Sequence, residues 1–354
     1  MSNALCRRLG IEHPVLLAPM AGEAAKPALA AAVSGAGGLG MLGCGYMTPQ
    51  AVRDTIRAIR ATTDRPFGIN LFTPLDWTAD PEKMVAYRAQ LAAAHADLGI
   101  PEPDIPNKYE ESYAEQLAVI LDEAPPVFGC TFGIPGPDEM AALKARGILV
   151  VGTATTVAEA VALEAAGVDA VAAQGAEAGG HRGSFLVPFD AALIGTMALV
   201  PQIVSAVSVP VIAAGGIADG RGVAAALCLG AQAAAIGTGF LLADEAGLNM
   251  AYRGALQGGG VHDTVLTRAF SGRPARGIRN AFLERLAGSD AEIPDYPVAN
   301  AMSRTMRAAA AKAGRAEYLS LWAGQAGALA RAEPAAAILH RVMAEARQAL
   351  VQAL

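Results

Sequence analysis

A glycine-rich decapeptide around one histidine is the stretch of this sequence best suited to chemistry. Residues 174–183 read Gln-Gly-Ala-Glu-Ala-Gly-Gly-His-Arg-Gly and follow an apolar run, Val168–Ala173, that is typical of a buried strand. Glycines let a backbone bend sharply and approach a ligand closely. An unperturbed imidazole titrates near neutral pH, so we expect that His181 could accept a proton or donate a hydrogen bond. The competing interpretation is a surface turn with an incidental histidine.

Two further glycine-rich segments each follow an apolar run. Residues 213–217 read Ala-Ala-Gly-Gly-Ile, and residues 236–239 read Ile-Gly-Thr-Gly. Free N–H groups at Gly216, Gly237 and Thr238, with the Thr238 hydroxyl, could surround a phosphate without a lysine. Turns alone would also explain the glycines, but the pairing of two such ends favours a phosphorylated ligand. Flavin mononucleotide (FMN) is one candidate.

A third glycine cluster matches a known fingerprint in the wrong context. Residues 35–40, Gly-Ala-Gly-Gly-Leu-Gly, fit the dinucleotide-binding pattern G-x-G-x-x-G. That pattern requires a strand before it and a helix after it. Here an alanine-rich helical pattern precedes the glycines and a strand-like run follows them. We therefore expect a tight helix-to-strand turn at this position and no dinucleotide site.

Eight short apolar runs alternate with helical patterns along the chain. The runs predicted as strands are Val15–Ala18, Leu39–Leu42, Phe67–Leu71, Val127–Thr131, Leu149–Gly152, Val168–Ala173, Val211–Ala214 and Ala233–Ile236. This alternation indicates parallel βα units. Their number and the chain length favour an α/β fold of the (β/α)₈ TIM-barrel class over a doubly wound sheet. Residues that follow barrel strands are then expected to bind or catalyse.

Two stretches interrupt the alternation and predict the domain organisation. Residues 73–112 form a long, proline-containing excursion after the third strand, on the side where barrels elaborate their sites. We expect a barrel over residues 1–245 and a smaller, mostly helical cap over its mouth at 246–326. The C-terminal segment, 327–354, would place its last helix back on the barrel.

Composition and charge exclude several classes of function. The 354 residues are 53% hydrophobic and 17% charged, which suits an α/β enzyme with a buried parallel sheet. A net charge of −6 without any basic run argues against nucleic acid. The four cysteines lie apart from one another, so no metal is expected and a cytoplasmic setting is the default. Glycine and proline interrupt the apolar runs before they reach membrane-spanning length.

The histidine segment, Glu177–Gly183, resembles the signature of the nitronate monooxygenases, formerly called 2-nitropropane dioxygenases. Segments along nearly the whole chain match that family in order. They are Ala18–Gly22, Gly35–Gly40, Gly68–Phe72, Phe128–Pro135, Ala213–Ile217, Phe270–Asn280 and Trp322–Gln325. The resemblance implies a flavin-bearing (β/α)₈ barrel with a smaller second domain, and FMN as the cofactor.

Carried onto this sequence, the resemblance implies a catalytic residue, His181, beside the flavin ring. The cofactor-binding residues that follow from it, with the adjoining glycine-rich ends, are Met20, Asn70, Gln174, Gly179, Gly180, Gly215, Gly216, Ala235, Ile236, Gly237 and Thr238. The family often has glutamine at the position of Ala235. A side-chain contact to the cofactor is then either missing or supplied by Gln232 or Gln325.

The activity that the resemblance implies is oxidation of alkyl nitronates, such as propionate 3-nitronate, by bound flavin and O₂. The products are a carbonyl compound and nitrite. His181 would hydrogen-bond the nitro oxygens or act as a base on a neutral nitroalkane.

Flavin-type enoyl-acyl carrier protein reductases, and a group that reduces quinones with NADH, share the histidine segment. An NAD(P)H-dependent flavin reductase is therefore the alternative, but segments 73–112 and 264–280 favour the nitronate-oxidising group. A flavin-storage module would have no use for His181.

The remaining candidates have weaker signals. Tyr296, Asn300 and Arg304 have near-helical spacing and could face the substrate, although contacts between cap and barrel explain them equally well. The histidine at position 95 lies on an alanine-rich helical stretch and is expected on a solvated face. The expected partners are a nitronate or nitroalkane and O₂, with the chain acting as a monomer or homodimer.

Overall fold

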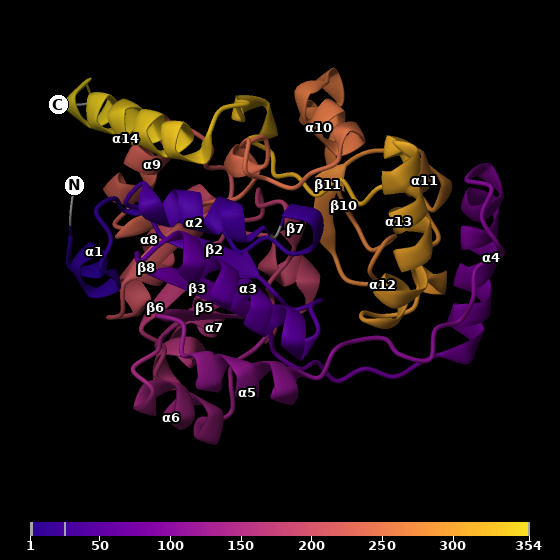
Figure 1. The fold of residues 1–354 in the computed structure, drawn as a ribbon, viewed down its shortest axis with the longest axis horizontal. Helices are drawn as coiled ribbons and strands as arrows, with labels where there is room; N and C mark the ends of the chain where they lie inside the picture. Colours follow the sequence, from indigo (N-terminus) through magenta and orange to yellow (C-terminus); the bar gives the residue numbers. More distant parts are fainter. Residues whose placement is uncertain (1–2, 25, 353–354) are drawn as a thin grey trace.

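The computed structural model describes residues 3–24 and 26–352, and within them a parallel barrel carries a cap on one side (Figure 1). The barrel strands are β1 (Val15–Leu17), β2 (Gly40–Gly43), β3 (Phe67–Phe72), β4 (Val127–Thr131), β5 (Leu149–Ala154), β6 (Ala170–Gln174), β8 (Val211–Ala214) and β9 (Ala233–Ile236). Each lies on one of the eight apolar runs predicted as strands. The predicted (β/α)₈ barrel is confirmed.

The barrel closes between its first and second strands. The sheet runs in the order β1-β9-β8-β6-β5-β4-β3-β2. Parallel bridges then join Leu16 to Leu39 and Met20 to Leu42, and the N–H of Leu17 donates to the carbonyl of Leu39 at 2.9 Å. Parallel pairing throughout brings the carboxyl ends of all eight strands to one mouth.

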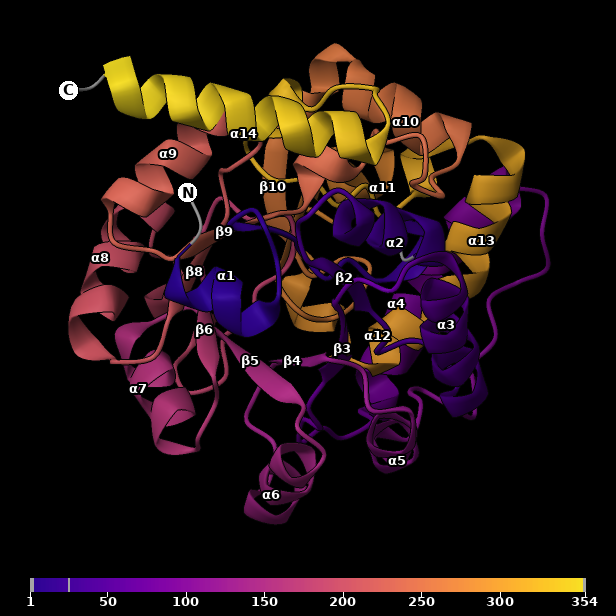
Figure 2. The same cartoon turned by 60° about the vertical axis from the view of Figure 1, so that its left-hand side comes forward.

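Helices follow the strands and surround the barrel (Figure 2). They are α2 (Pro27–Gly35), α3 (Pro49–Thr62), α5 (Tyr113–Glu123), α6 (Pro137–Ala145), α7 (Val157–Ala165), α8 (Thr196–Ala206) and α9 (Gly220–Cys228). Local sequence fixes many of their starts. Proline opens α2, α3 and α6, and side chains of Thr48, Ser112, Thr156 and Asp219 cap α3, α5, α7 and α9.

The glycine cluster at 35–40 is the predicted helix-to-strand turn. Helix α2 ends at Gly35, and β2 begins at Gly40. Gly37 has a φ of +93°, which L side chains rarely adopt. A Cβ at Gly40 would collide with the backbone of Ala30, so glycine there permits close packing of α2 on β2.

A short helix that the sequence did not reveal, α1 (Ala4–Leu9), closes the far end of the barrel. Its Leu5 and Leu9 pack with Leu16 and Met41 in the apolar cluster of the barrel interior. The side chain of Gln232 holds this helix, because its Oε1 accepts from the N–H of Leu5 at 3.2 Å. Residues at this end are remote from the barrel mouth.

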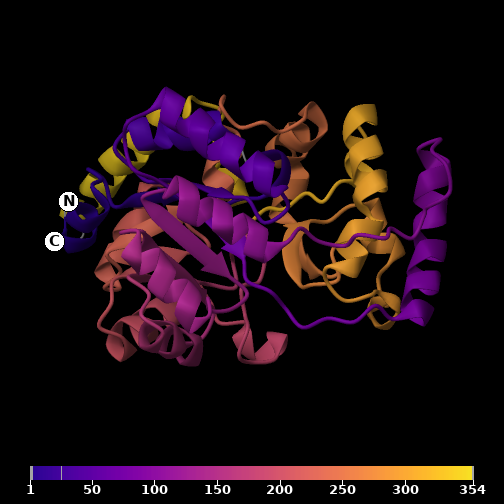
Figure 3. The ribbon, with the colours of Figure 1, turned by 60° about the horizontal axis from the view of Figure 1, so that its bottom comes forward.

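The cap combines helices with a small antiparallel sheet (Figures 1 and 3). Its elements are α4 (Pro81–Asp97), α10 (Met250–Gln257), β10 (Thr264–Thr267), β11 (Ala275–Ile278), α11 (Ala281–Arg285), α12 (Val298–Met302) and α13 (Arg304–Ala313). The sheet order is β10-β11-β7, where β7 is Gly180–His181 of the decapeptide. The cap is therefore joined to the histidine segment by strand pairing.

The excursion after β3 contributes α4 to the cap core. Tyr87 of α4 is fully buried, and its hydroxyl donates to the carbonyl of Ala269 at 2.6 Å. Met84 and Leu91 join the same apolar cluster.

The expectation of a solvated His95 is wrong, since only 2% of this residue is exposed and its Nδ1 lies 2.6 Å from the carbonyl of Pro101. Because alanines flank His95, nothing in the sequence indicated that this face of α4 is buried against the rest of the protein.

The last helix, α14 (Ala335–Gln352), lies along α9 and α2 of the barrel (Figure 2). Glu345 accepts from the N–H of Gly220 at 3.0 Å, and a Cβ at Gly220 would collide with the backbone of Ala346. Residues 353–354 of the predicted helix lie outside the described residues. In the described ranges, no helix combines the length and apolarity needed to cross a bilayer.

Candidate active site

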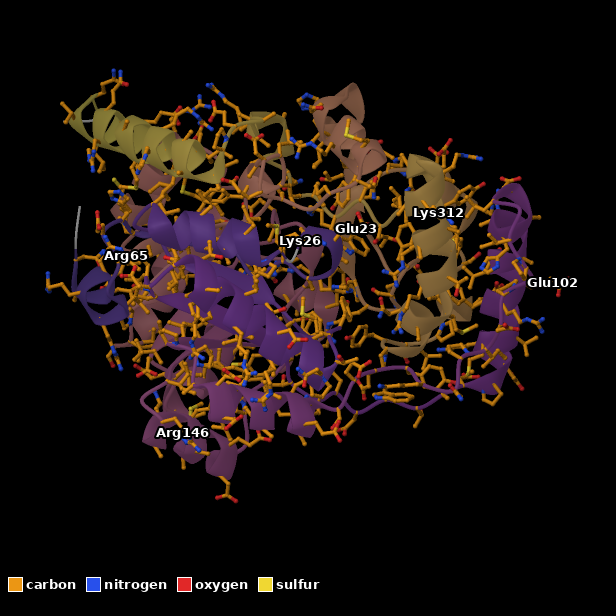
Figure 4. All side chains as sticks on the ribbon, viewed as in Figure 1. Glu23, Lys26, Arg65, Glu102, Arg146 and Lys312 are labelled. Atoms are coloured by element: carbon orange, nitrogen blue, oxygen red, sulfur yellow. The ribbon has the colours of Figure 1, made fainter. Side chains whose placement is uncertain are left out.

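A cavity of about 410 Å³ lies between the barrel mouth and the cap. Figure 4 labels Glu23, one of its lining residues, at the junction of the two parts. Among the residues predicted from sequence, those that line the cavity are Met20, Asn70, Gln174, Gly179, Gly180, His181, Gly215, Gly216, Ala235, Gly237 and Thr238. The structure therefore brings all but one of the predicted site residues to a single cavity.

Ile236 is the exception, because strand alternation turns it away. Ala233 and Ala235 belong to the apolar cluster inside the barrel, whereas Ala234 and Ile236 pack in the cluster between strands and helices. Gln232 is at the opposite end of the barrel, where it holds α1. Its side chain is therefore not a substitute for the glutamine often found at position 235.

The ends of β8 and β9 present free N–H groups to the cavity. Gly215 and Gly216 have φ angles of +104° and +70°, which glycine adopts without strain. Among the hydrogen bonds of the described residues, none uses the N–H of Gly216, Gly237 or Thr238. The Thr238 hydroxyl accepts from the N–H of Gly324 at 2.9 Å and keeps its own proton for a ligand. This group of donors suits an anion.

Gln174 and Asn70 lie at the carboxyl ends of β6 and β3. The Gln174 amide donates to the carbonyl of His181 at 3.0 Å and accepts from the N–H of Gly183 at 2.8 Å. Asn70 is 3% exposed and accepts from the Thr131 hydroxyl at 3.3 Å. Both amides are therefore fixed by protein contacts, and Gln174 also fixes the histidine loop.

A buried arginine next to the histidine braces the same loop. Arg182 is fully buried, and its guanidinium donates to the carbonyls of Gly175, Gln174 and Ala192 at 2.5, 3.0 and 2.8 Å. Burial lowers its pKa to about 10, so it stays charged at neutral pH. These contacts cross-link the decapeptide and limit the movement of His181.

The cap segment 322–325 packs directly on the decapeptide. A Cβ at Gly179 would lie 2.5 Å from the N of Gly324, so only glycine allows this approach. The N–H of Gln325 donates to the carbonyl of Glu177 at 3.0 Å, while the Gln325 side chain is exposed. The segment thus covers the loop through its backbone.

His181 pairs with a cap serine. The strand β7 pairs with β11, and this places Nε2 of His181 2.8 Å from Oγ of Ser271. The same Oγ lies 3.1 Å from the carbonyl of Arg273 and 3.3 Å from its N. All partners are satisfied when Ser271 donates to that carbonyl and Nε2–H donates to Ser271. Nδ1 is then the acceptor of the ring.

The surroundings keep the imidazole neutral. Burial of the ring lowers the pKa of His181 to about 3, and the positive charges of Arg273 and Arg307 act in the same direction. Arg273 is itself held over the Phe132 ring, with its guanidinium carbon 4.1 Å from the ring centroid. At neutral pH the imidazole is therefore uncharged, and one of its ring nitrogens is free to accept a hydrogen bond.

Aromatic rings surround the histidine on several sides. Ring centroids of Phe132, Tyr296 and Trp322 lie 5.9, 5.9 and 5.6 Å from the imidazole, and that of Phe72 lies at 6.4 Å. Phe132 has a φ of +80°, a strained value for a residue with a side chain. This backbone directs its ring toward the site.

The cap residues singled out from sequence have different positions. Arg304 lines the cavity, Tyr296 packs edge-on against His181, and Asn300 is buried and accepts hydrogen bonds from Arg307. The sequence did not reveal Ser271, Arg307 or Tyr46 as site residues. Ser271 lies in the segment 270–280 that carried the resemblance, but only the pairing of β7 with β11 reveals its contact with His181.

Comparison with known proteins is consistent with this geometry. The family model described as nitronate monooxygenase matches residues 2–345. A protein described as probable nitronate monooxygenase from Staphylococcus aureus (strain Newman) is 42% identical over 347 residues, 98% of each chain. One with the same description from Staphylococcus saprophyticus is 40% identical over 354 residues, again with 98% of each chain covered.

Solved structures agree with the sequence relatives. Nitroalkane oxidase from Streptomyces ansochromogenes is 41% identical, with a TM-score of 0.93 over 99% of this chain and 100% of that one. FabK from Thermotoga maritima is 32% identical, with a TM-score of 0.77 over 100% and 98% of the two chains. From the family match along nearly its whole length, from these identities and from the shared fold, the chain is an oxidoreductase that belongs to the nitronate monooxygenase family.

Proposed function

We propose that the protein oxidises alkyl nitronates, such as propionate 3-nitronate, with FMN and O₂ to a carbonyl compound and nitrite. One observation carries this proposal: a neutral His181 and a set of unpartnered N–H groups line the same cavity. The descriptions of the relatives from Staphylococcus and Streptomyces support the same reaction class.

The residues at the ends of β8 and β9 fit the phosphate of FMN. The N–H groups of Gly216, Gly237 and Thr238 would hold it, since they have no partner among the described residues and face the cavity. Asn70 and Gly179 would contact the rest of the flavin. When bound there, the flavin supplies the electron acceptance that oxidation of a nitronate requires.

The residues of the chain itself supply orientation and proton transfer. Nδ1 of His181 would accept the proton of a neutral nitroalkane, while Ser271 fixes the ring through Nε2. Because the Nε2–H group is committed to Ser271, Nδ1 is the ring nitrogen left to face a substrate, and it can accept a proton but not donate one to the nitro oxygens. The aromatic rings around His181 would exclude water from the reacting carbon.

The alternative, an NAD(P)H-dependent flavin reductase, has support from the likeness to FabK. The two functions separate under anaerobic conditions. We expect rapid flavin reduction by nitronate and slow or no reduction by NADH or NADPH, after heat release has identified the cofactor as FMN. Rapid reduction by a nicotinamide cofactor without any reduction by nitronate would assign the protein to the reductases.

We also propose a cytoplasmic setting and a monomeric or homodimeric state. The four cysteines are free in the structure, as a reducing compartment would keep them. Gel filtration with light scattering would measure the mass of the particle directly, and a mass above that of two chains would contradict the proposed state.

A further inference from the structure

The turn proposed to hold the cofactor phosphate has little structure of its own. Gly215 and Gly216 follow β8 with φ angles of +104° and +70°. Glycine reaches such values without strain, but it also loses more conformational freedom on ordering than any other residue. Among the described residues, a single hydrogen bond reaches the backbone of these two glycines, from the Thr196 hydroxyl to the carbonyl of Gly215 at 2.9 Å. The order of the turn therefore depends on how Thr196 is held.

Thr196 is held by a carboxylate of the histidine loop. Both oxygens of Glu177 accept from the N–H of Thr196 at 2.9 Å, and Oε2 also lies 2.8 Å from the Thr196 hydroxyl. Because that hydroxyl has a single proton, the carboxylate and the carbonyl of Gly215 share it. Only 9% of Thr196 is exposed, so water competes little for these contacts. Glu177, Thr196 and Gly215 thus form a continuous chain of contacts, which we call the glutamate brace.

The start of helix α8 favours a carboxylate at this position. Thr196 is the first residue of α8, and the N-cap residue before it, Gly195, has no side chain that could cap the helix. Glu177 supplies the cap from another loop, and the partial positive charge of the helix end stabilises its negative charge. A Cβ at Gly195 would lie 3.1 Å from Oε1 of Glu177, so glycine there leaves room for the carboxylate.

The histidine loop and the phosphate turn are in direct contact around the brace. The N–H of Gly175 donates to the carbonyl of Ala214 at 2.8 Å. A Cβ at Gly175 would lie 1.9 Å from Oγ1 of Thr196, so only glycine allows the loop to lie this close. A Cβ at Gly216 would lie 3.4 Å from Cβ of Glu177, so the glutamate is directly beside the turn. A shift of either segment would therefore move the other.

The brace acts on the site from outside the cavity. Neither Glu177 nor Thr196 is among the described residues that line the cavity, whereas Gly215, Gly216 and His181 are. Glu177 and His181 belong to the same decapeptide, residues 174–183. Any effect of the brace on a ligand or on the imidazole must therefore pass through the backbone that it holds.

We propose that Glu177 and Thr196 are positioning residues that hold the Gly215–Gly216 turn in the form that binds a phosphate, and thereby couple phosphate binding to the placement of the histidine loop. This inference rests on the proposed function, which assigns the phosphate of FMN to that turn. A turn that spends only a fraction of its time in the binding form has an apparent affinity reduced by that fraction. Conversely, a phosphate that binds this form stabilises it, and with it the histidine loop.

The test compares two flavins that differ only in the phosphate, FMN and riboflavin. Dilution of the FMN-loaded enzyme, followed by the fluorescence of released flavin, gives the Kd of FMN, and competition gives the Kd of riboflavin. Thr196→Val keeps the shape of the side chain but removes the hydroxyl. It should raise the Kd of FMN about tenfold, the usual cost of a lost hydrogen bond to a charged group, and that of riboflavin less than about twofold. Equal weakening of both flavins, or no weakening of FMN, would overturn the brace.

Two further variants separate the brace from a general loss of stability. Thr196→Ser keeps the hydroxyl and should bind FMN within about threefold of wild type. Ser208→Ala is the matched control, because the Ser208 hydroxyl donates an equivalent bond to Glu164 at 2.8 Å, before β8 and so at the opposite end of the barrel from the mouth. It should leave both Kd values unchanged. Weak FMN binding in Thr196→Ser or in Ser208→Ala would contradict the proposal.

Hydrogen exchange tests the coupling in the wild type, whether or not a variant folds. Peptides that cover residues 174–183 should exchange more slowly with saturating FMN than with saturating riboflavin, because the phosphate orders the turn and the brace extends that order to the histidine loop. Thr196→Val should abolish the difference. Equal exchange with the two flavins in the wild type would overturn the coupling.

Oxygen uptake with a nitronate keeps this proposal distinct from the proposed function. If the FMN-loaded enzyme oxidises no nitronate but Thr196→Val weakens FMN selectively, the proposed reaction fails and the brace stands. If a nitronate is oxidised while Thr196→Val changes the affinity for neither flavin, the reaction stands and the brace is overturned.

Discussion

Nε2 of His181 lies 2.8 Å from Oγ of Ser271, a residue 90 positions later in the chain. The contact joins the barrel loop to the cap, because it is set by the pairing of β7 with β11. The histidine is therefore oriented by a side chain that belongs to the other part of the molecule. Any change that displaces the cap should also change the chemistry of the imidazole.

Replacing His181 with asparagine should affect two substrates differently. Asparagine keeps a polar side chain of similar size but has no group that accepts a proton at neutral pH. Turnover of nitroethane should fall about 10²–10⁴-fold, the usual loss for a positioned general base. Turnover of pre-formed ethyl nitronate should fall only about tenfold, because that substrate has already lost its proton. Equal losses on both would mean that His181 binds the anion and is not a base.

Replacing Ser271 with alanine should reproduce part of that pattern. Loss of one net hydrogen bond is worth about 1 kcal/mol, so kcat on nitroethane should fall about fivefold. The nitronate should be affected less, since orientation of the imidazole matters chiefly for proton removal. Steady-state assays with both substrates give the comparison, and a larger loss on the nitronate would contradict a positioning role for Ser271.

The low pKa of His181 predicts how stability changes with pH. In the folded protein the imidazole protonates only near pH 3, whereas in the unfolded chain it does so near 6.5. Between these values the unfolded state binds more protons, so stability falls as the pH is lowered through that window. From pH 7 to 5 the contribution of this residue should fall by about 2 kcal/mol.

Urea unfolding of wild type and His181→Asn at both pH values measures this contribution. The wild type should lose about 2 kcal/mol more than the variant on acidification. Identical losses in the two proteins would show that the imidazole already titrates normally in the folded state.

Two glycines with similar backbone angles test the phosphate site. Gly216 has a φ of +70° and Gly314, at the end of α13, a φ of +67°. Alanine at either position should cost about 1–2 kcal/mol of stability, since neither new Cβ meets backbone. Only Gly216→Ala should also weaken FMN binding, by about tenfold, because it displaces an N–H that faces the cavity. Similar FMN affinity in both variants would contradict the assignment.

Local sequence signals account for most of the barrel. Helix α3 (Pro49–Thr62) has a clear local signal at its start, because proline opens the helix and Thr48 caps it. Helix α1 has too few residues to show a helical period, and α4 lies within a stretch whose prolines suggested a loop. The glycines of the site could be predicted because their backbone function leaves a local pattern.

Contacts between residues that are far apart in the sequence left no such local pattern. Ser271 and His181 are brought together by pairing of β7 with β11, and neither strand is long enough to show alternation. Arg307 resembles any other arginine of an exposed helix until the fold shows that its Nε is buried without a partner. The face of Ile236 depended on strand register, which the apolar run Ala233–Ile236 does not reveal.

Oxygen uptake by the purified, FMN-loaded protein with propionate 3-nitronate, measured together with nitrite release, tests the central claim most directly. Nitronate oxidation in the cavity around His181 predicts rapid, enzyme-dependent oxygen consumption with nitrite formed in proportion to substrate consumed. Loaded protein that consumes no oxygen with this or any simple alkyl nitronate, while NADH or NADPH reduces its flavin rapidly, would contradict the account.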